Sequence, residues 1–119
     1  LLNFQLNDRF LLTLILLGQP ELRSKVEAIK QLSQRVVIRY HLMPFNVDEV
    51  GDYINFRMQA AGASRVVFTP KAVAAVYKAS GGIPRKVNTI ADLALLIGFM
   101  ERCQQVRPEI VRKAVAEAQ

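Results

Sequence analysis

The sequence predicts a mainly helical α+β protein in two parts, an incomplete α/β piece at residues 1–42 and a four-helix unit at residues 43–119. Two apolar runs of strand type predict the first part, and repeated helix start and stop signals predict the second. The sequence Met43-Pro44-Phe45 marks the boundary between them. With 119 residues, 51% hydrophobic and 22% charged, the chain has the size and composition of a folded protein with one or two small domains.

The first part is expected to be a βαβ-like unit. Residues 11–17 (LLTLILL) form a continuous apolar run before Gly18, which is typical of a strand buried on both faces. Pro20 and Glu21 suit the first turn of a helix. Residues 36–40 (VVIRY) are rich in β-branched side chains and predict a second strand. Such a unit is too small to bury both faces of its own sheet.

The second part is expected to hold four helices. Their start signals are Asn46 with Glu49 three residues later, Thr69-Pro70, Pro84 and Pro108. Gly62 and the pair Gly81-Gly82 provide stop signals, because glycine adopts the left-handed backbone conformation that often ends a helix. Apolar residues at helical spacing follow each start, so each helix has one face for a common core.

Composition excludes several functions. The single cysteine, Cys103, and the single histidine, His41, rule out an internal disulfide and argue against a zinc site. No apolar run approaches the ~18 residues that indicate a membrane span. The net charge of +6 favours an anionic partner without choosing among nucleotide, nucleic acid and acidic lipid. The chain has neither an initiator methionine nor a signal-peptide pattern, and we expect it to be a piece of a longer protein.

The most informative segment is residues 80–86 (SGGIPRK). Pro84 fixes the start of a helix and places Arg85 and Lys86 in its first turn, where the helix dipole disfavours each cation by ~0.3–1 kcal/mol. A phosphate at this position would compensate, because backbone N–H groups, dipole and guanidinium all attract an anion. A helix start with two solvated basic side chains fits the same residues.

Two further polar residues lie where an open α/β sheet binds ligands or a neighbouring subunit. Gln19 lies in the turn Gly18-Gln19-Pro20 that follows the first predicted strand, and Arg35 directly precedes the second. Each also has an ordinary interpretation, Gln19 as a turn residue and Arg35 as half of a surface ion pair. No role is assigned to Arg39 or His41. The sequence contains no Gly-x-x-x-x-Gly-Lys-Ser/Thr loop and no Asp-Glu pair after an apolar run, so it holds no complete nucleotide site.

Four short stretches carry a resemblance to a known family: GQPEL (18–22), LSQR (32–35), RYHL (39–42) and SGGIPR (80–85). In this order they resemble the C-terminal part of the AAA+ ATPase domain of the general secretion pathway protein A family, which serves type II secretion. The GIPR element is common to many AAA+ proteins, and GQPEL with RYHL narrows the resemblance. It implies that residues 1–42 are a partial α/β core, the remnant of a phosphate-loop sheet, and residues 43–119 the helical lid.

The resemblance also implies roles. Gln19 stands at the sensor 1 position, Arg35 is the candidate arginine finger, and Arg85 is the sensor 2 arginine of a nucleotide-binding element with Gly82, Pro84 and Lys86. ATP and Mg²⁺ are then the cofactors of the longer protein, with none expected in this chain alone. Neighbouring ATPase subunits and an inner-membrane secretion protein are the implied partners, at the cytoplasmic face of the inner membrane.

Two alternatives remain at this point: an AAA+ transposition ATPase with the same lid motif, and a basic helical nucleic-acid-binding module. Against nucleic acid, no predicted helix carries basic residues along one face. The predicted sheet also lacks the strand that separates its two strands in the family. We therefore expect residues 1–42 to self-associate through the incomplete sheet, by strand pairing or strand exchange with a second copy.

Overall fold

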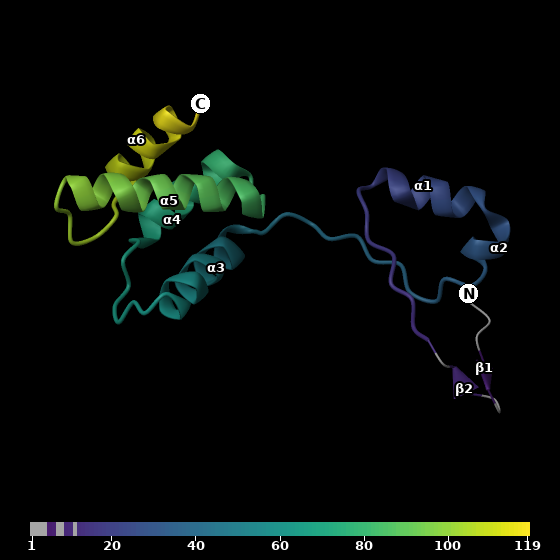
Figure 1. Cartoon of the computed structure of the whole chain (residues 1–119). Coiled ribbons are helices and arrows are strands. Elements are labelled where there is room, and N and C mark those ends of the chain that lie inside the picture. The colour runs from purple at the N-terminus through teal and green to yellow at the C-terminus, as the bar shows by residue number, and fades with distance from the viewer. Residues whose placement is uncertain (1–4, 7–8, 11) are drawn as a thin grey trace. The chain divides into compact units, whose positions relative to one another are not determined.

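The chain folds into two compact units, Leu1–Leu42 and Met43–Gln119. The computed structural model describes residues 5–6, 9–10 and 12–119. Figure 1 shows the first unit in purple to blue and the second in teal to yellow. Their elements differ in kind, because the first unit is built largely from extended chain and the second from four helices.

The first unit contains a short hairpin and two short helices. Strand β1 (Gln5–Leu6) pairs antiparallel with β2 (Arg9–Phe10). Helix α1 (Glu21–Ala28) starts one residue after Pro20, and α2 (Lys30–Ser33) follows it almost directly. The chain on either side of these helices, at residues 12–19 and 36–45, has no regular secondary structure.

The predicted parallel sheet is wrong. Neither residues 12–17 nor residues 36–40 form a strand, and Leu11 lies outside the described residues. The physical reason is that β propensity measures how well a side chain fits a paired, half-buried surface, and no strand among the described residues provides that surface for these segments. Self-association by strand pairing was expected from the edges of this sheet, and that basis is lost with it.

The first unit also lacks a buried core among its described side chains, which are those of residues 12–42. Leu22, Val26 and Val36 are only half-buried. The extended segments expose much more, with Leu17 at 86% and Val37 at 92% of their full accessible surface. Apolar side chains of this kind stabilise a fold only when they are removed from water.

The second unit consists of α3 (Val47–Ala60), α4 (Pro70–Ser80), α5 (Pro84–Met100) and α6 (Pro108–Ala118). All four predicted helix starts are confirmed. The Asn46 side chain accepts a hydrogen bond from the Glu49 N–H at 2.8 Å, and the Glu49 carboxylate accepts one from the Asn46 N–H at 3.0 Å. The Thr69 hydroxyl caps α4 by accepting from the Ala72 N–H at 3.1 Å.

The four helices enclose one hydrophobic core. Helix α5 packs along α6, and α4 contacts the other three helices. A parallel backbone bridge between Phe68 and Val106 joins the segments that lead into α4 and α6. The buried apolar residues are Val50, Ile54, Phe68, Ala72, Val76, Val87, Ile90, Ala91, Ala94, Val106, Ile110, Val111 and Ala114. The turn between α4 and α5 is thus held between two helices fixed in this core.

Candidate functional site

The turn that joins α4 to α5 is a compact two-glycine connection. Gly81 and Gly82 both have positive φ, 63° and 77°, in the left-handed region that glycine adopts without strain. The Gly81 N–H donates to the Tyr77 carbonyl at 2.9 Å, and the Ile83 N–H donates to the Ser80 carbonyl at 3.2 Å. The turn therefore satisfies its own backbone groups and holds the start of α5 close to the end of α4.

Ser80 completes this turn from inside. Its side chain is buried, with 2% of its surface accessible, and its hydroxyl accepts a hydrogen bond from the Gly82 N–H at 3.1 Å. The hydroxyl also lies 3.4 Å from the Tyr77 carbonyl, to which it can donate. Sequence analysis predicted the glycines as turn residues but assigned nothing to this serine.

Replacing Ser80 with alanine is expected to lower the free energy of unfolding of the four-helix unit by about 1–3 kcal/mol, because the buried Gly82 N–H loses its acceptor. Urea unfolding followed by circular dichroism measures the change. Ser64→Ala is the matched control, because Ser64 is exposed in a loop of the same unit. Equal effects of the two substitutions would show that the Ser80 hydroxyl has no structural role.

Gly82 faces the segment by which the chain enters this unit. The Phe45 N–H donates to the Gly82 carbonyl at 2.9 Å. A Cβ added at Gly82 would overlap the Phe45 carbonyl oxygen and would lie 2.9 Å from its carbon. At Gly81, by contrast, a Cβ would meet nothing within 4 Å. Glycine is therefore required at position 82 by close backbone approach as well as by φ.

Arg85 and Lys86 lie in the first turn of α5, directly after Pro84, and both side chains are exposed. In the described part of the chain neither side chain forms a hydrogen bond or ion pair, and the first turn of α5 contains no acidic residue. The Val87 N–H is the first to bond backward, to the Ile83 carbonyl at 2.9 Å. Two uncompensated cations thus remain at the positive end of the helix dipole.

The three N–H groups of the glycine turn are not available to an anion. The N–H groups of Gly81, Gly82 and Ile83 are all used inside the turn and do not point at a ligand. The donors still available to an anion are the backbone and side-chain N–H groups of Arg85 and Lys86, in the first helical turn. An anion would therefore bind at the start of α5 and not in the glycine turn.

A polar cluster of Tyr53, Arg57 and Asn88 lies beside this helix start, and sequence analysis did not find it. The Tyr53 hydroxyl donates to the Asn88 side-chain oxygen at 2.8 Å, and the Arg57 guanidinium donates to the same oxygen at 3.1 Å. The Arg57 guanidinium also donates to the Tyr53 hydroxyl at 3.3 Å, and this hydrogen bond lowers the pKa of the Tyr53 phenol and raises the pKa of Arg57. The one signal in the sequence is that Asn88 interrupts the apolar stripe of α5 next to Val87.

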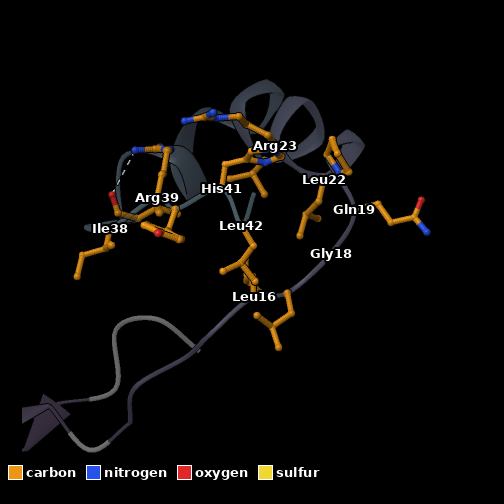
Figure 2. A pocket seen from close by; sticks show the side chains of 14 residues that line it. Leu16, Gly18, Gln19, Leu22, Arg23, Ile38, Arg39, His41 and Leu42 are labelled. Carbon is orange, nitrogen blue, oxygen red and sulfur yellow. Dashed lines mark hydrogen bonds between the residues drawn. The ribbon is translucent and has the colours of Figure 1, made fainter. Parts of the chain in front are cut away.

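The first unit contains a separate hollow of about 530 Å³ between its two extended segments. Its lining comes from the segment before α1, from α1 and from residues 36–42, and includes Gln19, Arg39 and His41. Figure 2 shows Gln19 at the rim with its amide turned away from the other labelled side chains. Most of the lining is apolar, and its polar side chains include Arg23 besides these three.

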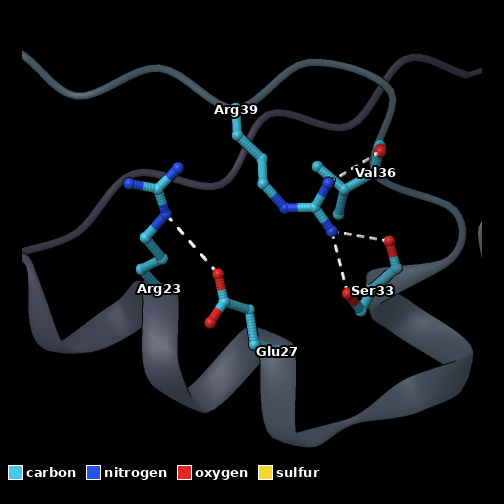
Figure 3. Close-up of polar contacts among 5 residues, drawn as sticks. All are labelled: Arg23, Glu27, Ser33, Val36 and Arg39. Atoms are coloured by element: carbon cyan, nitrogen blue, oxygen red, sulfur yellow. Dashed lines mark hydrogen bonds and ion pairs between the residues drawn. The ribbon is translucent and has the colours of Figure 1, made fainter.

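Arg39, to which the sequence assigned no role, has a structural one. Its guanidinium donates to the Ser33 carbonyl at 2.7 Å and to the Ser33 hydroxyl at 2.8 Å, which closes the turn after α2 (Figure 3). In the same view Arg23 pairs with Glu27 at 3.6 Å along α1. Arg35 is exposed in this turn, and its backbone N–H donates to the Leu32 carbonyl at 3.0 Å.

The predicted site residues thus fall into two groups. Gly82, Pro84, Arg85 and Lys86 share one turn of the second unit, whereas Gln19 and Arg35 belong to the first. Within residues 5–6, 9–10 and 12–119, no group of three or more His, Cys, Asp or Glu side chains is arranged to hold a metal ion. No helix in the described part of the chain is both long and apolar enough to cross a membrane.

The fold and turn define a class of protein: a small helical domain that presents an unpaired basic pair at a proline-started helix. Over 101 residues, 83% of its length, the chain is 43% identical to general secretion pathway protein A of Aeromonas hydrophila. The predicted resemblance to the general secretion pathway protein A family is confirmed over these residues. The match spans 18% of that relative. No protein-family model and no solved structure matches the chain.

Proposed function

We propose that this chain is part of an AAA+ ATPase of the general secretion pathway, in which Arg85 contacts the γ-phosphate of bound ATP. The observation that carries the proposal is the pair Arg85 and Lys86, exposed and without a side-chain partner at the start of α5. The identity to general secretion pathway protein A supports the pathway. Phosphate is the ligand whose charge and oxygens match this arrangement best.

In this proposal the four-helix unit is the lid of the ATPase. Pro84 fixes the first turn of α5, Gly82 lets the turn approach Phe45 closely, and Lys86 adds a second cation beside Arg85. Gln19 would orient the attacking water, and Arg35 would reach the nucleotide of a neighbouring subunit. ATP and Mg²⁺ would be bound by residues of the longer protein that this chain does not contain. Phosphoryl transfer depends mainly on such positioning and charge neutralisation.

The proposed partners are neighbouring ATPase subunits and an inner-membrane secretion protein that the ATPase would meet from the cytoplasm. Exposed apolar side chains in the first unit support a protein contact there, since Val37 and Ile38 have accessible fractions of 92% and 81%. The described residues of that unit offer nothing that covers them. Turnover by the longer ATPase with Arg85 replaced is the direct test of the function.

The 119-residue chain alone is expected to neither hydrolyse ATP nor bind it with sub-micromolar affinity. Its sequence contains no phosphate-cradling loop, so Arg85 and Lys86 act without a pre-formed pocket. Isothermal titration calorimetry with MgATP tests this expectation, with magnesium chloride alone as the control titration. Sub-micromolar binding would show that the chain carries a nucleotide site of its own. It would contradict the proposal that the longer protein supplies the residues that bind ATP and Mg²⁺.

A further inference from the structure

We infer that the segment entering the four-helix unit holds the start of α5 through two linked contacts and thereby positions Arg85. The contacts are the Phe45 backbone on Gly82 and the Tyr53 hydroxyl on Asn88, and we call them together the latch. The phosphate role of Arg85 in this inference rests on the proposed function. The latch itself rests only on the contacts described below.

The first contact leaves no free space. The Phe45 N–H binds the Gly82 carbonyl at 2.9 Å, and Gly82 is buried and cannot carry even a methyl group without displacing the Phe45 backbone. Gly82 in turn lies two residues before Pro84, where α5 begins. A shift of Phe45 must therefore displace either this turn or the hydrogen bond that ties the two together.

The second contact extends the first along α5. The Phe45 and Tyr53 rings pack with centroids 5.3 Å apart, and the Tyr53 hydroxyl binds Asn88 at 2.8 Å. Asn88 lies three residues after Arg85, so the two are close on the helix surface. The latch thus holds α5 both before and after Arg85, and side chains in a packed arrangement of this kind move together.

The position of the latch in the chain gives it a consequence. Met43 directly follows Leu42, the last residue of the first unit, and Phe45 comes two residues later. Any force that the first unit exerts along the chain reaches the second unit at this segment. Phe45, Tyr53 and Asn88 are therefore positioning residues that connect the first segment of the second unit to the direction of Arg85.

Hydrogen exchange on the full 119-residue chain tests the latch without any ligand. Gly82→Ala is expected to raise the exchange rates of the Phe45 and Val87 amides together, by at least about tenfold, because both report on the same structure. Gly81→Ala is the matched control: it has the same left-handed φ but open space for its Cβ, and should leave the Phe45 amide protected. Tyr53→Phe, which removes only the hydroxyl, should raise both rates by a smaller factor.

Faster exchange at Phe45 with no change at Val87, in either Gly82→Ala or Tyr53→Phe, would overturn the latch. If Gly82→Ala does not fold, Tyr53→Phe decides the question alone, since it introduces no clash. A merely structural role for Gly82 would raise exchange throughout the unit, including the core amide of Val111 in α6. The latch requires that Val111 exchange stays close to that of the unaltered chain in Tyr53→Phe.

Inorganic tripolyphosphate then tests positioning. Chemical-shift titration should show Arg85→Ala weakening the apparent affinity roughly tenfold, the effect of one hydrogen bond to a charged group. Gly82→Ala should weaken the affinity to the same degree. The double variant Gly82→Ala with Arg85→Ala should weaken it no further, because both substitutions remove the same interaction between Arg85 and the phosphate. Unchanged affinity in Gly82→Ala, with Arg85→Ala weakened, would overturn positioning. Unchanged affinity in Arg85→Ala would instead contradict the proposed function, while hydrogen exchange still decides the latch.

Discussion

Replacing Arg85 with alanine in the proposed longer ATPase is expected to lower the turnover number for ATP hydrolysis by ~10³-fold or more, the effect of losing an arginine that contacts a transferred phosphoryl group. In the proposed function a guanidinium at the start of α5 would neutralise charge that develops on the γ-phosphate, and alanine would leave that charge without a partner. Steady-state phosphate release by the purified oligomer measures the change. The effect should act within the subunit that carries the substitution.

Lys71→Ala is the matched control for this experiment. Lys71 follows Pro70 at the start of α4 just as Arg85 follows Pro84 at the start of α5, and both side chains are exposed. Removing a solvated cation from a helix start should leave turnover nearly unchanged. If Arg85→Ala lowers the turnover number by less than about tenfold, Arg85 is a solvated side chain without a catalytic contact, as Lys71 is expected to be.

The helix starts of the second unit could be predicted because their causes are local. Asn46 with Glu49, Thr69 with Ala72, and Pro84 all act within one turn of the helix they begin, so the sequence alone determines them. The same holds for Arg85: its place in the first turn follows from Pro84, one residue earlier. Contacts between residues within four positions of each other could be predicted from the sequence.

The failed predictions depend on distant parts of the chain. Residues 12–17 and 36–40 have strand-type composition, but a strand also needs a hydrogen-bonding neighbour, which composition does not reveal. The Tyr53–Asn88 contact joins residues 35 positions apart, and the polar Asn88 in an apolar stripe does not reveal its partner. Ser80 lay next to two informative glycines, yet its acceptor role depends on the fold of the turn. The sequence therefore located the candidate site but not the contacts that hold it.

Replacing Arg35 with alanine is expected to lower the turnover number by a similar factor, ~10³-fold or more. The affected nucleotide site would be that of the neighbouring subunit. Arg35 is exposed beyond α2 in the first unit, whereas Arg85 belongs to the second unit. Arg23→Ala serves as the control, because Arg23 is an exposed arginine of the same unit whose ion pair with Glu27 is a surface pair of small energetic value.

Mixed oligomers distinguish action on a neighbour from action within the subunit. A subunit with a defective phosphate loop still carries Arg35, so it can complete the intact site of an Arg35→Ala subunit beside it, and mixing the two should restore part of the turnover. The same partner cannot rescue Arg85→Ala, because each subunit is then defective in its own site. Absence of rescue for Arg35→Ala at every mixing ratio would exclude Arg35 as an arginine finger. Rescue of both variants would show that Arg85 also reaches across the subunit boundary.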